Sequence, residues 1–159
     1  MSPRRDFIFK STQAVLAGLF LTKVSAPVWA SSAWTASSSA TPDSKKLTDV
    51  AKAAADCLRM GEACLAHCER ELATGDNGMA KCSEKVHEML AVTRAMLTLA
   101  SMKSPRALEM ASLCAEVCRN CADACAEHKE HFGHGMHLEC KACMEACQAC
   151  EKACNSLKA

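Results

Sequence analysis

Large aromatic side chains are scarce in this sequence, which has no Tyr, two Trp and four Phe among 159 residues. Beyond residue 30 only Trp34 and Phe132 remain. A core built from this region must therefore be filled with small side chains. The sequence also has no excess of positive or negative charge, because its formal net charge is +1 and its acidic and basic residues are interspersed. Without a basic face, a nucleic-acid partner has no electrostatic support.

The sequence also lacks an apolar run of the roughly 20 residues that a membrane-spanning helix needs. The apolar stretch from Ala14 to Leu21 follows the pair Arg4 and Arg5, and it precedes Val28-Trp29-Ala30, which can serve as a cleavage site. Residues 1–30 resemble a twin-arginine signal peptide, with an ordinary secretory signal as the alternative. We therefore expect export to the periplasm or another extracytoplasmic space, with no membrane attachment after cleavage.

A stretch rich in Ser, Ala and Thr follows the signal. Residues 31–44 show no apolar periodicity, so we expect a disordered linker there. The remaining residues, 45–159, are enough for one domain of ordinary size. The sequence thus predicts three parts: a signal peptide, a linker and one folded domain.

Turn signals and apolar periodicity predict four helices in that domain. Gly75 lies just past the end of the first helix, and Ser104 with Pro105 forms a helix start, Ser as N-cap and Pro as first helical residue. No strand pattern occurs in the sequence. The predicted helices cover about 45–74, 79–103, 105–130 and 138–157. Because the connections are short, we expect an all-α, up-down-up-down four-helix bundle.

Cysteine is the dominant feature of the domain. All thirteen Cys lie after Ala30, and the odd number excludes complete intramolecular disulfide pairing. On the first, third and fourth helices they recur in steps of three and four, with Gly61 at one missing position, which places the thiols of a helix on one face. The sequence therefore predicts a Cys-lined core formed by Cys57, Cys64, Cys68, Cys82, Cys114, Cys118, Cys121, Cys125, Cys140, Cys143, Cys147, Cys150 and Cys154.

Simple packing does not account for these thiols. Free Cys is often buried as a small hydrophobic residue. However, the inner stripe of the fourth helix between Leu138 and Leu157 contains no Leu, Ile, Val or Phe, so that helix alone would bury little apolar surface. Iron–sulfur ligation is also disfavoured, because its Cys runs lie in loops that wrap a cluster.

Two other uses of the thiols stay open. A disulfide-laced scaffold or a thiol redox protein is compatible with export, although consecutive thiols on one helix face have many competing partners, and redox catalysis needs an exposed thiol of low pKa. A zinc-binding thiolate store is compatible with the Cys-x-x-Cys steps, although zinc requires four tetrahedral ligands. These steps are Cys118-Cys121, Cys140-Cys143 and Cys147-Cys150.

Cu(I) suits a column of thiols best. It is a soft ion that prefers thiolate, and thiolates from neighbouring turns can bridge successive ions. One monovalent ion for each thiolate leaves the core almost neutral, whereas a divalent ion with four thiolates buries net negative charge. The sequence therefore predicts storage or sequestration of many Cu(I) ions.

The Cys pattern resembles that of the copper storage proteins, Cys-lined four-helix bundles that bind Cu(I). The resemblance covers about residues 54–159, and it is most specific in Cys57-Leu-Arg-Met-Gly61-Glu-Ala-Cys64-Leu-Ala-His67-Cys68, in Met79-Ala-Lys-Cys82 and in residues 139–154. It implies a homotetramer, no catalysis, and copper enzymes or chaperones as recipients of the metal. The Cys-x-x-x-Cys pairs that match family ligands are Cys64/Cys68, Cys114/Cys118, Cys121/Cys125, Cys143/Cys147 and Cys150/Cys154.

One end of the bundle is the predicted site of metal uptake. An up-down-up-down course brings the first and third connections together, and with them soft ligands that need not lose a proton. We expect His67 and Met79 to bind metal there, near His128, His131, His134, Met136 and His137. We expect the opposite end to be closed by Leu97, Leu99, Met102 and Leu108.

Overall fold

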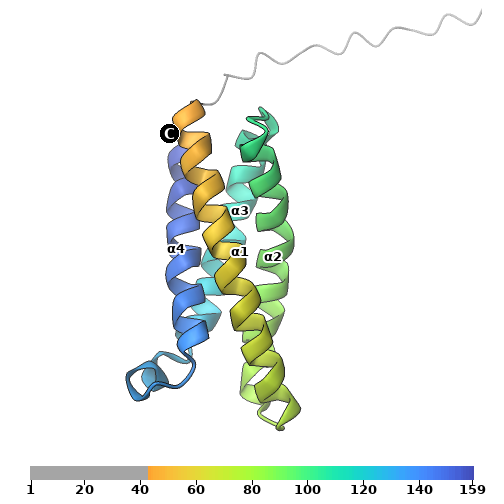
Figure 1. Ribbon diagram of the computed structural model, residues 1–159, viewed down its shortest axis with the longest axis vertical. Helices are drawn as coiled ribbons and strands as arrows, with labels where there is room; N and C mark the ends of the chain where they lie inside the picture. Colours follow the sequence, from red (N-terminus) through yellow and green to blue (C-terminus); the bar gives the residue numbers. More distant parts are fainter. Residues whose placement is uncertain (1–42) are drawn as a thin grey trace, which may run out of the picture. The chain divides into compact units, whose positions relative to one another are not determined.

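The computed structural model of the protein describes residues 43–159, which form four long helices (Figure 1). Each helix packs against two neighbours, in the cyclic order α1, α2, α3, α4. The described part of the chain contains no strand, and the predicted up-down-up-down bundle is confirmed. The elements are α1 (Ser44–Ala73), a 3-10 turn η1 (Asn77–Met79), α2 (Ala80–Ser101), α3 (Arg106–Ala126), a second 3-10 segment η2 (Lys129–His134) and α4 (Leu138–Lys158).

A side-chain cap defines where α1 begins. The Asp43 carboxylate accepts a hydrogen bond from the Lys45 amide at 2.8 Å, and Ser44 is the first residue of α1. These two residues of the predicted linker therefore belong to the folded part, while the predicted signal and residues 31–42 lie outside the described residues. α3 begins one residue later than predicted, with Pro105 as N-cap and Arg106 as its first residue, and the Ser104 hydroxyl accepts a hydrogen bond from the Arg106 amide at 3.3 Å.

The third helix ends earlier than the sequence predicted. α3 stops at Ala126 rather than near Glu130, and the chain continues as the 3-10 segment η2, which contains no buried residue. Helices of this length are stabilised mainly by a packed face. Because the inner stripe of α3 ends at Cys125, nothing beyond it favours another α-helical turn. Gly135 and His137, both at positive φ, then redirect the chain into α4.

The lower end of the bundle in Figure 1 carries the turn between α1 and α2 and the segment between α3 and α4. At the opposite end, the predicted closure is only partly right. Leu97, Leu99 and Leu108 are partly buried against the core, but Met102 is 72% exposed, because it follows the last residue of α2. Buried apolar residues at this end include Leu47, Val50, Met96, Ala100, Ala107 and Leu157.

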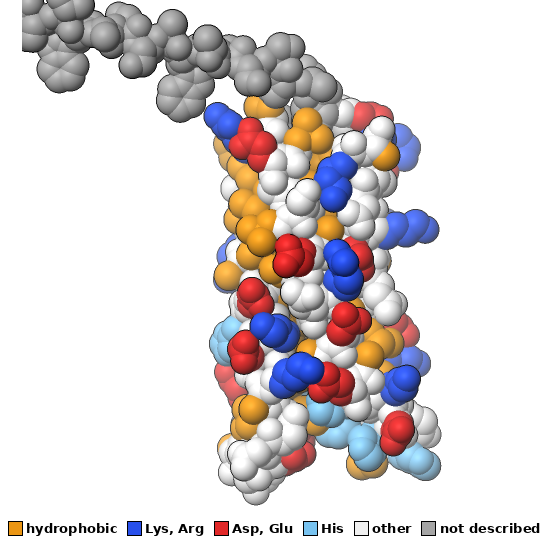
Figure 2. Space-filling model, turned by 180° about the vertical axis from the view of Figure 1, so that it is seen from behind, with side chains coloured by type: hydrophobic (Ala, Val, Ile, Leu, Met, Phe, Trp, Pro, Cys, Tyr) orange, Lys and Arg blue, Asp and Glu red, His pale blue; other side chains and the backbone are white. Residues whose placement is uncertain are grey.

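The face of the bundle drawn in Figure 2 is mixed in charge. It shows acidic and basic side chains interspersed, apolar side chains along the upper left edge, and histidines at the lower right. Ion pairs between helices, such as Arg94 with Glu62 at 2.8 Å, are exposed and so contribute about 0 to 1 kcal/mol. None of the described helices combines the length and the apolar character needed to cross a membrane.

Candidate metal centre

All thirteen Cys side chains are buried and unpaired, with their thiols facing the interior of the bundle. α1 supplies three thiols, α2 one, α3 four and α4 five. The helical steps of three and four keep each set on one face, and packing of the four helices turns those faces toward one another. The predicted Cys-lined core is therefore present with every member in place.

The thiol cluster nearest the α1–α2 turn holds four sulfur atoms within 4.8 Å of one another. Its members are Cys64 and Cys68 of α1, Cys82 of α2 and Cys140 of α4. Cys64 Sγ lies 3.7 Å from Cys140 Sγ and 3.9 Å from Cys82 Sγ. Because three helices contribute, an ion bound here would join them.

Further groups of three thiols continue this cluster along the bundle. Most neighbouring groups along the bundle share one residue, which is Cys64, Cys143 or Cys150. Two neighbouring groups share none, and they are connected through Cys57 and Cys147, whose sulfur atoms are 3.5 Å apart. The thirteen thiols therefore form one connected column. The groups are Cys64/Cys125/Cys143, Cys121/Cys143/Cys147, Cys57/Cys118/Cys150 and Cys114/Cys150/Cys154.

The sulfur atoms lie in van der Waals contact and are not joined by disulfides. Contacts such as Cys121 to Cys143 at 3.8 Å and Cys82 to Cys125 at 3.6 Å are far longer than a disulfide bond of about 2.05 Å. Two thiolates at this spacing can share one soft ion after small side-chain movements.

Contacts among neighbouring thiols determine which of them ionise. The pKa of Cys125 is raised above its ordinary value of 9.0, first by the contact with Cys121 and also by burial. The pKa of Cys82 is lowered to about 5, first by its contact with the Cys125 thiol. Contact with Cys114 likewise lowers the pKa of Cys154 to about 5. A proton kept on one thiol thus stabilises the thiolate beside it, which is ready to bind a soft cation.

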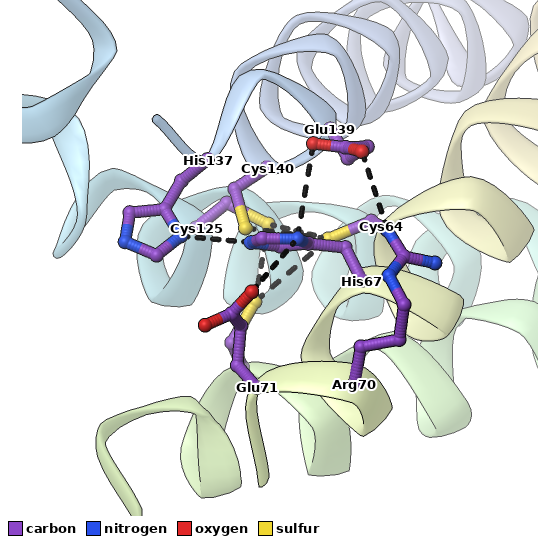
Figure 3. A network of polar contacts seen from close by, with 9 residues as sticks. Cys64, His67, Arg70, Glu71, Cys125, His137, Glu139 and Cys140 are labelled. Atoms are coloured by element: carbon purple, nitrogen blue, oxygen red, sulfur yellow. Dashed lines mark hydrogen bonds and ion pairs between the residues drawn. The ribbon is translucent and has the colours of Figure 1, made fainter. Parts of the chain in front are cut away.

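His67 lies at the end of the column, where its exposed fraction is 8%. Its Nε2 is 2.8 Å from Nδ1 of His137, and its Nδ1 is 3.8 Å from Glu71 and 3.9 Å from Glu139 (Figure 3). Glu139 is also 3.5 Å from Arg70. These polar contacts fix the orientation of the imidazole beside the first thiol cluster.

The other residues predicted at this end are divided between core and surface. Met79 lies in η1 and is buried, whereas Met136 is half exposed. The rings of His128 and His131 lie 5.4 and 5.5 Å from that of His137, and both His131 and His134 are exposed. A hollow of about 290 Å³ opens here, lined by His67, Glu71, Gly135, Met136, His137 and Glu139.

Two residues of α2 contact the column without having been predicted as donors. Met89 Sδ is 3.4 Å from Cys57 Sγ, and Thr93 Oγ1 is 3.7 Å from Cys118 Sγ. Both are buried and share the inner stripe of Cys82 in steps of three and four. Their positions on this stripe could have identified them from the sequence as contacts of the column. However, Met and Thr on such a stripe are also ordinary core residues.

Comparison with known proteins connects this geometry to a family. The family model described as Csp, copper storage protein, matches residues 43–159. The chain belongs to the copper storage protein family. Among curated proteins, no sequence matches the chain.

Solved structures of copper storage proteins share this fold. A cytosolic copper storage protein from Streptomyces lividans, loaded with five coppers, is 28% identical over 73% of this chain and 94% of its own, with a TM-score of 0.63. Ccsp from the same organism, loaded with 10 copper equivalents, is 27% identical over 76% and 89%, with a TM-score of 0.64. Cu(I)-bound Csp3 of Bacillus subtilis is 24% identical over 72% and 99%, with a TM-score of 0.62, a likeness of fold.

Proposed function

We propose that this chain stores many Cu(I) ions as cargo along its core, with thiolates as ligands. The observation that carries the proposal is the unbroken column of thirteen buried thiols, every one of which belongs to a group close enough to hold an ion. Family membership and the copper-loaded relatives support the choice of metal.

Charge balance favours Cu(I) over a divalent ion for the column as a whole. Each Cu(I) displaces about one proton, so a filled column carries nearly the same charge as an empty one. A divalent ion held by four thiolates would leave a charge of about −2 in an apolar interior, which is costly. Loading with a monovalent ion can therefore proceed along the whole column.

Zinc is the second candidate metal, because one thiol cluster provides a suitable set of ligands for it. Cys64, Cys68, Cys82 and Cys140 provide four sulfurs within 4.8 Å of one another, which is the ligand set of a structural zinc site. The other groups contain three thiols and share members, so they cannot all be tetrahedral zinc sites at once. Zinc would thus fill a small part of the column.

A storage role without catalysis agrees with the burial of the thiols. Thiol–disulfide exchange requires an accessible thiolate, and each of the thirteen is buried. In our proposal the protein is exported by the twin-arginine route to the periplasm or another extracytoplasmic space. It assembles there as a homotetramer, as the family resemblance implies, and supplies copper enzymes or chaperones.

Copper is proposed to enter at the end that carries His67 and Met79. The hollow beside His137 lies at this end, and imidazole and thioether groups can hold Cu(I) without losing a proton. The first thiolates beyond them are those of Cys64, Cys68, Cys82 and Cys140. At the other end, buried apolar side chains such as Leu47 and Met96 pack together instead.

The proposal is tested by titrating the reduced protein with Cu(I) against a competing chelator, and then with zinc. We expect saturation on the order of one Cu(I) per Cys, because bridging thiolates can each serve more than one ion. Saturation at only two or three Cu(I) ions would contradict the column. A larger tight capacity for zinc than for Cu(I) would favour the alternative.

A further inference from the structure

The shortest contact between Cys57 and a neighbouring sulfur involves a thioether. Met89 Sδ of α2 lies 3.4 Å from Cys57 Sγ, closer than the 3.5 Å between Cys57 and Cys147. Met89 is 0% exposed, so its sulfur lies inside the column. Cys57 donates this S–H···S hydrogen bond, which means that a sulfur lone pair of Met89 points toward the thiol.

Met89 lies on α2 at a level of the column where that helix has no Cys. The single Cys of α2, Cys82, belongs to the cluster at the uptake end. At the middle of the column, Cys57 of α1 meets Cys147 of α4, and it forms a group with Cys118 and Cys150. The sulfur that α2 contributes at this level is that of Met89.

A gap in α1 creates the space that Met89 occupies. Gly61 lies one helical turn after Cys57 on the inner face, at the position where the Cys stripe of α1 is interrupted. A Cβ at Gly61 would lie 2.6 Å from the Met89 methyl carbon and 2.9 Å from Leu90. The missing side chain therefore lets the end of Met89 approach α1 and brings its sulfur beside Cys57.

Binding of Cu(I) to the column changes the contact between Cys57 and Met89. When Cu(I) replaces the proton of Cys57, the hydrogen bond is lost, and lone pairs of a thiolate and a thioether face each other. A soft cation between the two sulfurs removes that repulsion. The flexible Met side chain can adjust its sulfur to ligand distance.

We propose that Met89 is a Cu(I) ligand in the middle of the column, forming a mixed thiolate and thioether site with Cys57. This inference rests on the proposed storage function. Because a thioether is neutral and releases no proton, the site holds one Cu(I) with one thiolate and without added charge. The middle of the column thus contains a thioether donor besides the thirteen thiols.

The test compares Met89→Leu with Met96→Leu in the reduced protein. Both methionines are fully buried on α2, and Leu has nearly the volume of Met, so each change removes a thioether while preserving packing. We expect Met89→Leu to lower the tightly bound Cu(I) by about one ion, and Met96→Leu to leave it unchanged. Equal capacities in the wild-type protein and both variants would overturn the proposal.

A crystal structure of the Cu(I)-loaded wild-type protein provides a second measurement that does not depend on the variants folding. We expect an anomalous copper peak at bonding distance from Met89 Sδ. If every copper peak lies beyond that distance, the proposal is wrong. A wild-type protein that binds only two or three Cu(I) ions would instead contradict the storage function itself, so the two failures are distinguishable.

Discussion

The imidazoles of His67 and His137 are joined by a hydrogen bond of 2.8 Å between Nε2 and Nδ1, which connects α1 to the residue that precedes α4. His137 adopts a left-handed backbone conformation with φ of 52°, uncommon for a residue other than Gly. Two segments distant in the sequence thus meet over the first thiol cluster, at the proposed site of uptake.

Replacing His67 and Met79 by Ala is expected to slow Cu(I) uptake and removal by a chelator several-fold, with nearly unchanged final capacity. The reason is that both side chains lie at the end of the column while the thirteen thiols remain. Stopped-flow measurement of chelator exchange gives the rates. His87→Ala, an exposed imidazole on α2, is the matched control. Unaltered rates in the double variant would place the uptake site elsewhere.

Cu(I) is expected to raise the thermal midpoint of the reduced protein. An ion in the cluster of Cys64, Cys82 and Cys140 joins α1, α2 and α4, and the unfolded chain cannot present these thiols together. A single site at 100 times its dissociation constant adds about 2.7 kcal/mol, and further ions add to this. Differential scanning calorimetry with and without Cu(I) measures the effect. An unchanged midpoint in the loaded protein would mean that the ions do not connect helices.

The metal-free protein is expected to lose stability as the pH rises above about 9. The pKa values of Cys125, Cys147 and Cys150 are raised by contacts with Cys121, Cys118 and Cys114, respectively, and by burial. Below pH 9 these thiols are protonated in both states. Above it, the unfolded chain releases protons that the folded chain keeps, which costs about 1.4 kcal/mol per thiol for each pH unit.

Five thiols act in the opposite direction at lower pH, because contacts with neighbouring thiols lower the pKa values of Cys82, Cys118, Cys140, Cys143 and Cys154. The pKa values of Cys82 and Cys154 are lowered to about 5, so they add stability that is present above pH 9 and lost as the pH falls toward 5. Urea unfolding under reducing conditions from pH 5 to 10.5 should therefore give a maximum near pH 9. Stability that continues to rise above pH 9 would contradict the assignment of the raised pKa values.

Thr93→Cys is expected to increase the Cu(I) capacity by about one ion, because a thiolate there can bridge to neighbouring thiolates. Thr93 is fully buried, and its hydroxyl lies 3.7 Å from Cys118 and 4.0 Å from Cys114. Thr93→Val, of similar shape but without a donor, should leave the capacity unchanged. Chelator-competition titration distinguishes the variants, and an equal capacity in both would show that this side of α2 does not face bound metal.

Much of the fold followed from local signals. The steps between Cys140 and Cys154 predicted both an α-helix and its buried face, because a helix repeats every 3.6 residues. Ser104 and Pro105 predicted the start of α3 to within one residue, and the Ser104 hydroxyl accepts a hydrogen bond from the Arg106 amide. The end of α3 was misplaced, since residues 127–130 carry no breaker and the helix ends where its packing ends.

The sequence by itself determined that this protein is a helical bundle with thirteen inward thiols, because helical periodicity and side-chain type are local properties. Only the tertiary structure decided which thiols share a group, that Met89 reaches Cys57 through the space left by Gly61, and that His67 meets His137. These contacts join residues on different helices. Their geometry depends on the axial offset and rotation of packed helices, which the spacing within any one helix does not fix.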